Sequence, residues 1–189
     1  MKRSKEGRAG FHAWALLVGV NGGKHGDIPK KESNLKNVAF IQCQFVGSAL
    51  AIVCLGMQHS QSIKNLIFQS CDLGDHHNGG DGGDDGGDGD GSSYNIEIIA
   101  SALPLMNLSS LSLVDVNFPT RECLHYLLTH VEQAKELKLL DLSQNTLSAD
   151  CIALLSRSIR GQDQVSRLIL SDCSLDNACV KELTTGLRG

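Results

Sequence analysis

The sequence predicts an α/β protein built as a stacked array, with parallel strands lining one face and helices the other. The main evidence is a spacing of apolar residues, at the first, fourth, sixth and eleventh positions, shared by five segments that start at Leu35, Ile63, Leu108, Leu137 and Val165. The starts lie 28, 45, 29 and 28 residues apart. The long interval is 28 plus 17 residues, and the excess falls in one glycine–aspartate tract. A period of this size indicates units that bury their apolar faces only against neighbouring units.

Each segment combines a strand pattern with a helical pattern. The alternation of Leu140, Asp141 and Leu142 is typical of a strand. A polar or cysteine-containing turn follows, and apolar residues then recur at helical spacing. The expected helices begin at Thr120 or Arg121, at Ser148 and at Asp176, and their apolar sides carry Leu124, Leu127, Leu128 and Val131, then Ile152, Leu155 and Ile159, then Val180, Leu183 and Leu187.

The pattern L-x-x-L-x-L-x-x-N/C-x-L resembles leucine-rich repeats, and the period of 28–29 residues resembles their ribonuclease-inhibitor-like class. The segments LDLSQNTLSADCIALLSRSI and LILSDCSLDNACVKELTTGL are similar to the Asn-type and Cys-type units of that class, as in the repeat arrays of NOD-like receptors. The resemblance covers residues 35–189 and implies a horseshoe-shaped solenoid segment of five repeats, with strands on the concave face and helices on the convex face. Val116 stands where the pattern has Asn or Cys, so we expect a looser turn there.

Residues 1–34 are expected to form a degenerate N-terminal cap or tail. Phe11, Trp14 and Leu16 match the first three apolar positions of a unit, and the open end of a stacked array exposes an apolar layer that needs a cover. The basic start MKRSKEGR and the apolar run Ala13–Val20 also resemble a signal peptide, but no clear small-residue cleavage site follows. No segment approaches the ~20 apolar residues of a membrane-spanning helix.

Most cysteines follow the repeat period. Cys43, Cys71 and Cys173 take the ninth position of their segments, and Cys123, Cys151 and Cys179 are spaced 28 residues apart. Only Cys54 lies outside these two registers. Such periodic positions suit small buried side chains. A total of seven cysteines is odd and would leave at least one unpaired in a secreted disulfide scaffold. We therefore expect reduced cysteines and a cytoplasmic protein.

The insert at residues 75–93 concentrates the acidity of the chain. Its six aspartates contribute a charge of −6, whereas the whole chain has a net charge of −4. The rest of the chain therefore carries a net charge of about +2. An EF-hand alignment ending in Glu97 puts Gly86 at the first ligand position, where a carboxylate is needed. We expect a disordered acidic loop that acts as a spacer and binds no metal. A weak electrostatic contact with a basic partner and an organised calcium site are the alternatives.

The residues between the ladder positions of each strand should point outward, onto the concave face. The predicted partner-binding residues are Ala39, Ile41, Ile67, Gln69, Ser112, Val114, Leu139, Asp141, Arg167 and Ile169. Six of them are aliphatic, and a stripe of exposed aliphatic residues is unusual on a protein that binds nothing. Single exposed apolar residues are common, however, and need no partner.

The sequence offers no credible catalytic or cofactor site. It has neither a phosphate-binding G-x-x-x-x-G-K-[ST] loop nor a nucleophile elbow, and its histidines show no metal-ligand spacing. No basic run is long enough to indicate nucleic-acid binding. The predicted function is non-catalytic binding of a protein partner. The alternative is a structural subunit, or a fragment of a larger receptor, GTPase regulator or cytoskeletal scaffold, that docks through its open C-terminal end.

Overall fold

The computed structural model describes residues 35–45, 48–73, 95–116, 118, 121–160 and 164–188. Within these ranges one parallel sheet holds five strands in the order of the sequence. The strands are β1 (Asn37–Ile41), β2 (Asn65–Gln69), β3 (Ser110–Val114), β4 (Leu139–Asp141) and β5 (Arg167–Ile169). The strands therefore pair only with their direct neighbours along the chain, and β1 and β5 are the edge strands.

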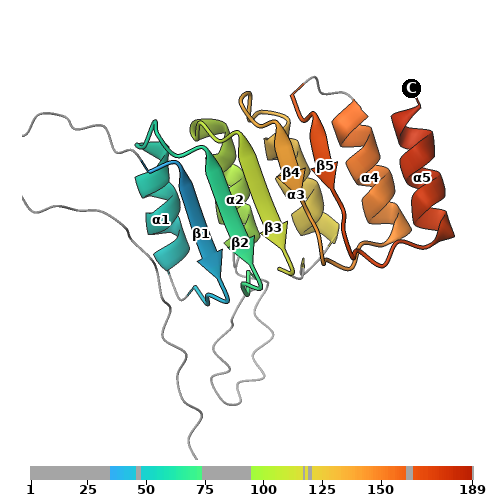
Figure 1. Ribbon diagram of the computed structural model, residues 1–189, viewed down its shortest axis with the longest axis horizontal. Helices are drawn as coiled ribbons and strands as arrows, with labels where there is room; N and C mark the ends of the chain where they lie inside the picture. The colour runs from blue at the N-terminus through green and yellow to red at the C-terminus, as the bar shows by residue number, and fades with distance from the viewer. Residues whose placement is uncertain are drawn as a thin grey trace, which may run out of the picture.

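A helix follows each strand, and the first four return the chain to the start of the next strand. The helices are α1 (Ala49–Gln58), α2 (Asn95–Ala102), α3 (Arg121–Val131), α4 (Ala149–Arg160) and α5 (Asn177–Leu187), with a short 3-10 helix η1 (Leu103–Leu105) after α2. These helices form a second layer along one side of the sheet (Figure 1). The α/β class predicted from the sequence is confirmed.

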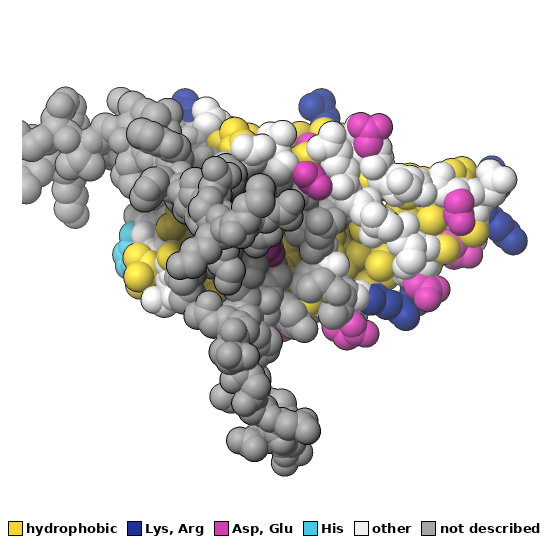
Figure 2. Space-filling view, turned by 90° about the horizontal axis from the view of Figure 1, so that it is seen from below, with side chains coloured by type: hydrophobic (Ala, Val, Ile, Leu, Met, Phe, Trp, Pro, Cys, Tyr) yellow, Lys and Arg dark blue, Asp and Glu magenta, His cyan; other side chains and the backbone are white. Residues whose placement is uncertain are grey.

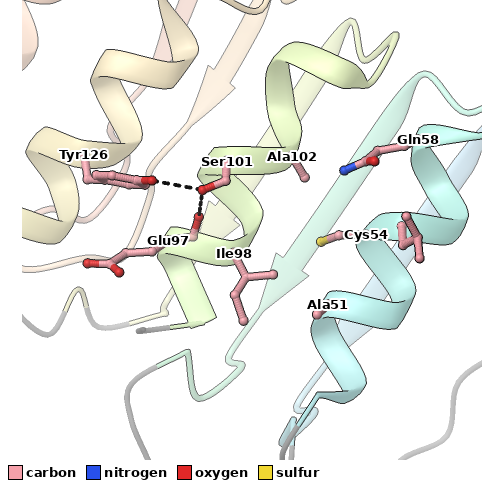
Figure 3. A pocket seen from close by; sticks show the side chains of 9 residues that line it. Ala51, Cys54, Gln58, Glu97, Ile98, Ser101, Ala102 and Tyr126 are labelled. Atoms are coloured by element: carbon pink, nitrogen blue, oxygen red, sulfur yellow. Dashed lines mark hydrogen bonds between the residues drawn. The ribbon is translucent and has the colours of Figure 1, made fainter. Parts of the chain in front are cut away.

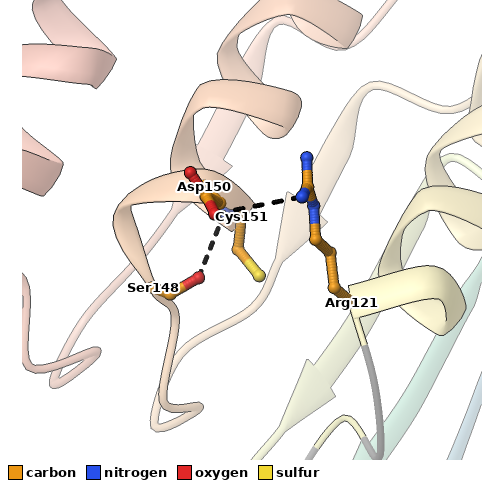
Figure 4. Close-up of polar contacts among 4 residues, drawn as sticks. All are labelled: Arg121, Ser148, Asp150 and Cys151. Atoms are coloured by element: carbon orange, nitrogen blue, oxygen red, sulfur yellow. Dashed lines mark hydrogen bonds and ion pairs between the residues drawn. The ribbon is translucent and has the colours of Figure 1, made fainter.

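The starts of α4 and α5 agree with the capping residues expected from the sequence. The backbone N–H of Cys151 donates to Ser148 Oγ at 3.3 Å, and that of Cys179 donates to Asp176 Oδ1 at 2.8 Å. The second bond holds the pKa of the Asp176 carboxyl below its usual range. Figure 4 shows the Ser148 cap beside an ion pair between Arg121 of α3 and Asp150 of α4, whose charged atoms lie 3.9 Å apart.

The core lies between the sheet and the helices. One register row of inward-facing strand residues crosses the whole sheet and consists of Val38, Leu66, Leu111, Leu140 and Leu168. The three members on the central strands are fully buried, whereas Val38 on β1 and Leu168 on β5 are only partly covered. Both ends of the sheet therefore present incompletely buried apolar residues.

The same backbone turn follows every strand. Gln42, Ser70, Asp115, Gln144 and Asp172 all have a left-handed conformation, with φ between 49° and 60°. The first four donate their N–H groups to a carbonyl one strand further along, as in Gln42 N to Gln69 O at 2.8 Å and Gln144 N to Ser171 O at 2.7 Å. Non-glycine residues rarely adopt this conformation, so its recurrence reflects a shared local geometry.

In three of these turns, the side chain directly after the left-handed residue turns inward and ties the turn to the preceding unit. Cys71 Sγ donates to Phe40 O at 3.3 Å, and Cys173 Sγ donates to Leu142 O at 3.2 Å. Asn145 Nδ2 donates to Leu113 O at 2.7 Å in the same manner. All seven cysteines of the chain are free, and burial raises the pKa of the Cys54 thiol to about 11.

The turn at Val116 is held differently from the looser turn that the sequence led us to expect. Its apolar side chain is buried and donates no hydrogen bond, but its backbone N–H donates to Asn145 Oδ1 at 3.0 Å. Asn145 also donates to Leu142 O and Ser143 O within its own turn. The following turn therefore supplies the polar partner that the Val116 side chain lacks.

Gly186 of α5 lies directly against α4. A Cβ added there would collide with Oγ and Cβ of Ser156, which is buried in α4. Replacing a helical glycine with alanine normally adds up to about 1 kcal/mol of stability. We expect Gly186→Ala instead to lower the free energy of unfolding by about 1–3 kcal/mol, because α5 must move away from α4.

Gly56 of α1 is the matched control, because no described atom lies within 4 Å of a Cβ added there. Gly56→Ala should stabilise the protein by about 0.5–1 kcal/mol. Urea denaturation of both variants measures the difference. Equal gains at the two positions would contradict the close packing of α4 and α5.

The predicted N-terminal cap at residues 1–34 and the predicted acidic insert at residues 75–93 both lie outside the described residues. The described residues on either side of the insert end at Leu73, in the turn after β2, and resume at Asn95, where α2 begins.

Candidate protein-binding face

The sheet side turned away from the helices is called the open face below. Three register rows of side chains cross it. The first row holds Asn37, Asn65, Ser110, Leu139 and Arg167; the middle row holds Ala39, Ile67, Ser112, Asp141 and Ile169; and the third row holds Ile41, Gln69 and Val114. All ten residues predicted from the sequence to bind a partner fall within these rows, because the strands pair without a register shift.

The open face is partly exposed along its whole length. Ile41 is 56% exposed, and Ala39, Gln69 and Arg167 are exposed as well. The half-buried members are Ile67, Val114, Leu139, Asp141 and Ile169. A partner placed across the sheet would therefore meet aliphatic side chains on every strand.

Ser112 is the exception among the ten. It is only 9% exposed, so the expectation of an exposed side chain is wrong at this position. Its register partners are Ile67 on β2 and Asp141 on β4. Both carry longer side chains, so the short serine lies below the surface that they form.

Asp141 of the open face is hydrogen-bonded to the turn that follows its strand. Asp141 Oδ1 accepts a hydrogen bond from the N–H of Ser143 at 3.0 Å, and Ser143 Oγ accepts one from the N–H of Ser171 at 3.1 Å. Register places Leu139, and not Asp141, opposite Arg167. Among the described residues no ion pair joins Asp141 to Arg167.

Charge is sparse and mixed on this part of the molecule. The three rows hold one acidic residue, Asp141, and one basic residue, Arg167. At the lower edge of the sheet, acidic and basic side chains are interspersed toward the C-terminal end (Figure 2). A ligand with a strong charge of one sign would therefore find no matching field on the open face.

The described residues show no arrangement typical of metal binding. No three His, Cys, Asp or Glu side chains among them are placed to hold a metal ion together. In the same ranges, no helix has the length and apolarity required to cross a bilayer. The chain matches no family model, and a search of curated proteins returned no match.

Sequence reasoning missed a cavity of about 450 Å³ on the helical side, between α1 and α2 (Figure 3). Its apolar lining comes from Ala51, Cys54, Leu55, Ile98 and Ala102, and its polar lining from Gln58, Glu97, Ser101 and Tyr126. Ser101 Oγ donates to the Glu97 carbonyl at 2.8 Å, so at the 3.0 Å contact with Tyr126 the tyrosine hydroxyl is the donor. The sequence carried one signal for this apolar site, which is that the segment Ala49–Gln58, the helix α1, contains no charged residue.

A second exposed apolar region lies at the C-terminal end of the array. We had expected Val180, Leu183 and Leu187 to form the buried side of the last helix. In the structure Val180 is 48% exposed, Leu187 is 53% exposed, and Leu183 is half-buried. No further layer among the described residues covers α5, so the predicted apolar side is present but largely uncovered.

Proposed function

We propose that this chain is a non-catalytic protein–protein interaction module that binds a protein partner on the open face of its sheet. The observation that carries this proposal is that every strand contributes a partly exposed aliphatic residue to that face. Ile41, Ile67, Val114, Leu139 and Ile169 represent all five strands. Exposed apolar residues gathered on one face of a protein often mark an interaction site.

A protein partner fits this surface better than other ligand classes. The face is nearly neutral, so it offers no phosphate-binding field for a nucleic acid. It is also a sheet surface without a deep cavity among the described residues, whereas small-molecule sites are usually concave. Half-exposed aliphatic side chains with a few bonded polar groups are typical of the core of a protein interface.

We further propose that the five strand–helix units are leucine-rich repeats of the ribonuclease-inhibitor-like class, arranged as a solenoid. Three regularities support this assignment. The sheet follows the order of the sequence, a left-handed residue follows every strand, and Cys71, Asn145 and Cys173 each donate to the preceding unit. With this assignment the open face corresponds to the concave face of the solenoid.

The test is affinity purification with quantitative mass spectrometry, comparing the unmodified chain with a variant carrying Ile67→Glu, Val114→Glu and Ile169→Glu. These residues lie on three different strands of the open face. We expect the captured partner to fall at least about tenfold, since three buried charges at an interface cost well over 1.4 kcal/mol. A far-UV circular dichroism spectrum and a thermal melt must show that the variant remains folded.

A second candidate function rests on the uncovered C-terminal layer. The chain would then act as a structural subunit that docks through β5 and α5. Leu168, Leu170, Leu175 and Leu183 are all half-buried there. Their counterparts one unit earlier, Leu140, Leu142, Leu147 and Leu155, are buried. Such an incompletely buried layer is what a docking partner would cover.

A variant with Leu183→Glu and Leu187→Glu separates the two candidates in the same experiment. Loss of the partner with the open-face variant alone supports the first function, and loss with the α5 variant alone supports the second. Retention of every specific partner by both variants would reject both. Each variant also serves as the folding-matched control of the other.

A further inference from the structure

The junctions between neighbouring units repeat the same backbone hydrogen bonds. At the start of each strand after β1, an N–H donates to a carbonyl of the unit before, as in Arg167 N to Lys138 O at 3.0 Å. At the end of each strand before β5, the N–H of the left-handed residue donates the other way, as in Gln144 N to Ser171 O. Each unit therefore offers a defined set of donors and acceptors to both of its neighbours.

The C-terminal end of the array carries this set without a following unit. By the repeat spacing, the groups that would bond a following unit are Ser166 O, Leu170 O and the N–H of Asp172. Leu170 is the counterpart of Leu142, whose carbonyl accepts from the Cys173 thiol. Because β5 is the last strand of the described sheet, these three groups lie along an open edge.

The N-terminal end of the array carries the matching groups. The N–H of Asn37, the carbonyl of Ile41 and the thiol of Cys43 occupy the positions that bond to a preceding unit elsewhere in the sheet. Cys43 Sγ donates to Ile41 O within its own turn at 3.4 Å, and β1 is the first strand of the described sheet. The two ends therefore match group for group: an N–H for a carbonyl, a carbonyl for an N–H, and a thiol for a carbonyl.

Helix α1 has open space at the position where α5 has a close contact. Gly56 and Gly186 occupy the same position of their units, 21 residues after the starts of their segments. In α5 this glycine lets Ser156 of α4 approach so closely that an added Cβ would collide with it. In α1 no described atom lies within 4 Å of a Cβ added at Gly56. The counterpart of Ser156 at the C-terminal end is Thr184, which is exposed. A preceding α5 therefore has room to approach α1 as α4 approaches α5.

We propose that copies of this chain associate head to tail, with β1 and α1 of one copy stacked on β5 and α5 of the next. These elements lie at opposite ends of the array (Figure 1). The contact would cover core residues that are only partly buried at both ends, which include Val38 and Phe40 on one copy and Leu168 and Leu183 on the other. The inference rests on the second candidate function, because it names the partner that covers the C-terminal layer.

A second copy suits this role because the two ends of one chain carry complementary groups at the same spacing. An interface between two different ends is heterologous, so each added copy leaves one free end of each kind. The association should therefore continue beyond a dimer, unless a ring closes.

The test is sedimentation velocity of the full chain over a range of concentrations. We expect the average mass to rise with concentration above the monomer value of 20.3 kDa. Gly56→Glu alters the N-terminal end and Leu187→Glu the C-terminal end, where Leu187 is 53% exposed although its counterpart Ile159 packs against the core. Each variant alone should lower the association constant at least about tenfold, because a carboxylate without a partner is disfavoured in a buried contact.

An equimolar mixture of the two variants tests the head-to-tail arrangement itself. The Gly56→Glu chain keeps an intact C-terminal end, and the Leu187→Glu chain keeps an intact N-terminal end. The mixture should therefore form a heterodimer of twice the monomer mass that does not grow further. Its formation would also show that both variants are folded.

Leu105→Glu is the matched control, because it adds the same charge at an apolar position that is 63% exposed and lies in η1, away from both ends. It should leave the association constant unchanged. A chain that stays at the monomer mass at every concentration would overturn the proposal, and so would association that persists in both end variants or a mixture that stays monomeric. A monomeric chain whose captured partner is still lost with the Leu183→Glu and Leu187→Glu variant would overturn this inference alone and leave the second candidate function in place.

Discussion

Replacing Asn145 with alanine is expected to lower the free energy of unfolding by about 3 kcal/mol. Asn145 is 1% exposed, and its amide donates to Leu113 O, Leu142 O and Ser143 O. Its Oδ1 also accepts from the buried N–H of Val116. Alanine leaves several buried backbone groups without this partner, and each unsatisfied group costs about 1–3 kcal/mol. Urea denaturation followed by circular dichroism measures the loss.

Asn145→Cys is the informative companion variant. Cysteine occupies the equivalent position in two other turns, where Cys71 and Cys173 donate to the carbonyl of the preceding unit. The thiol should restore the bond to Leu113 O but not the strong acceptor for the N–H of Val116. We therefore expect a loss of stability about half that of the alanine variant. Equal stability of the alanine and cysteine variants would show that the donated bond contributes little.

The second large effect is expected at Leu140, where an alanine should cost about 2–5 kcal/mol. Leu140 is fully buried at the centre of β4, and its register partners are Leu111 on β3 and Leu168 on β5. Truncation leaves a cavity beneath the sheet that surrounding residues can fill only in part.

Leu139 provides the control for this variant, since it is the adjacent residue but faces the open side and is half-buried. Leu139→Ala should cost less than about 1.5 kcal/mol, because much of its side chain already contacts solvent. Similar losses of unfolding free energy for the two variants would contradict the assignment of Leu140 to the core side of β4 and of Leu139 to the open face.

The sequence was a good guide to features that depend on local chemistry or on period. The starts of α4 and α5 follow from Ser148 and Asp176, because a capping side chain bonds to a backbone N–H only three residues away. The rows of the open face follow from the constant spacing of apolar residues within each segment, because the same internal spacing aligns equivalent strand positions in a parallel sheet.

Features that depend on contacts between units could not be predicted in this way. The burial of Ser112 is set by the lengths of its neighbours on β2 and β4. The hydrogen bond between Val116 and Asn145 joins residues 29 positions apart. The spacing pattern describes each segment by itself, so it does not include bonds between two segments. The cavity beside α1 depends on where α2 begins after the longest interval between segments, which composition alone cannot fix.

The turn bonding described above also gives the array a direction. Cys71, Asn145 and Cys173 each reach back to the unit before them, so removing a unit at the C-terminal side leaves the inward-turned donors of the remaining units paired. The junction between β3 and β4 is different, because the N–H of Val116 depends on Asn145 in the following unit. An array of this kind is therefore best shortened or recombined after the turn that contains Asn145. A cut directly after α3 would leave the buried N–H of Val116 without its acceptor.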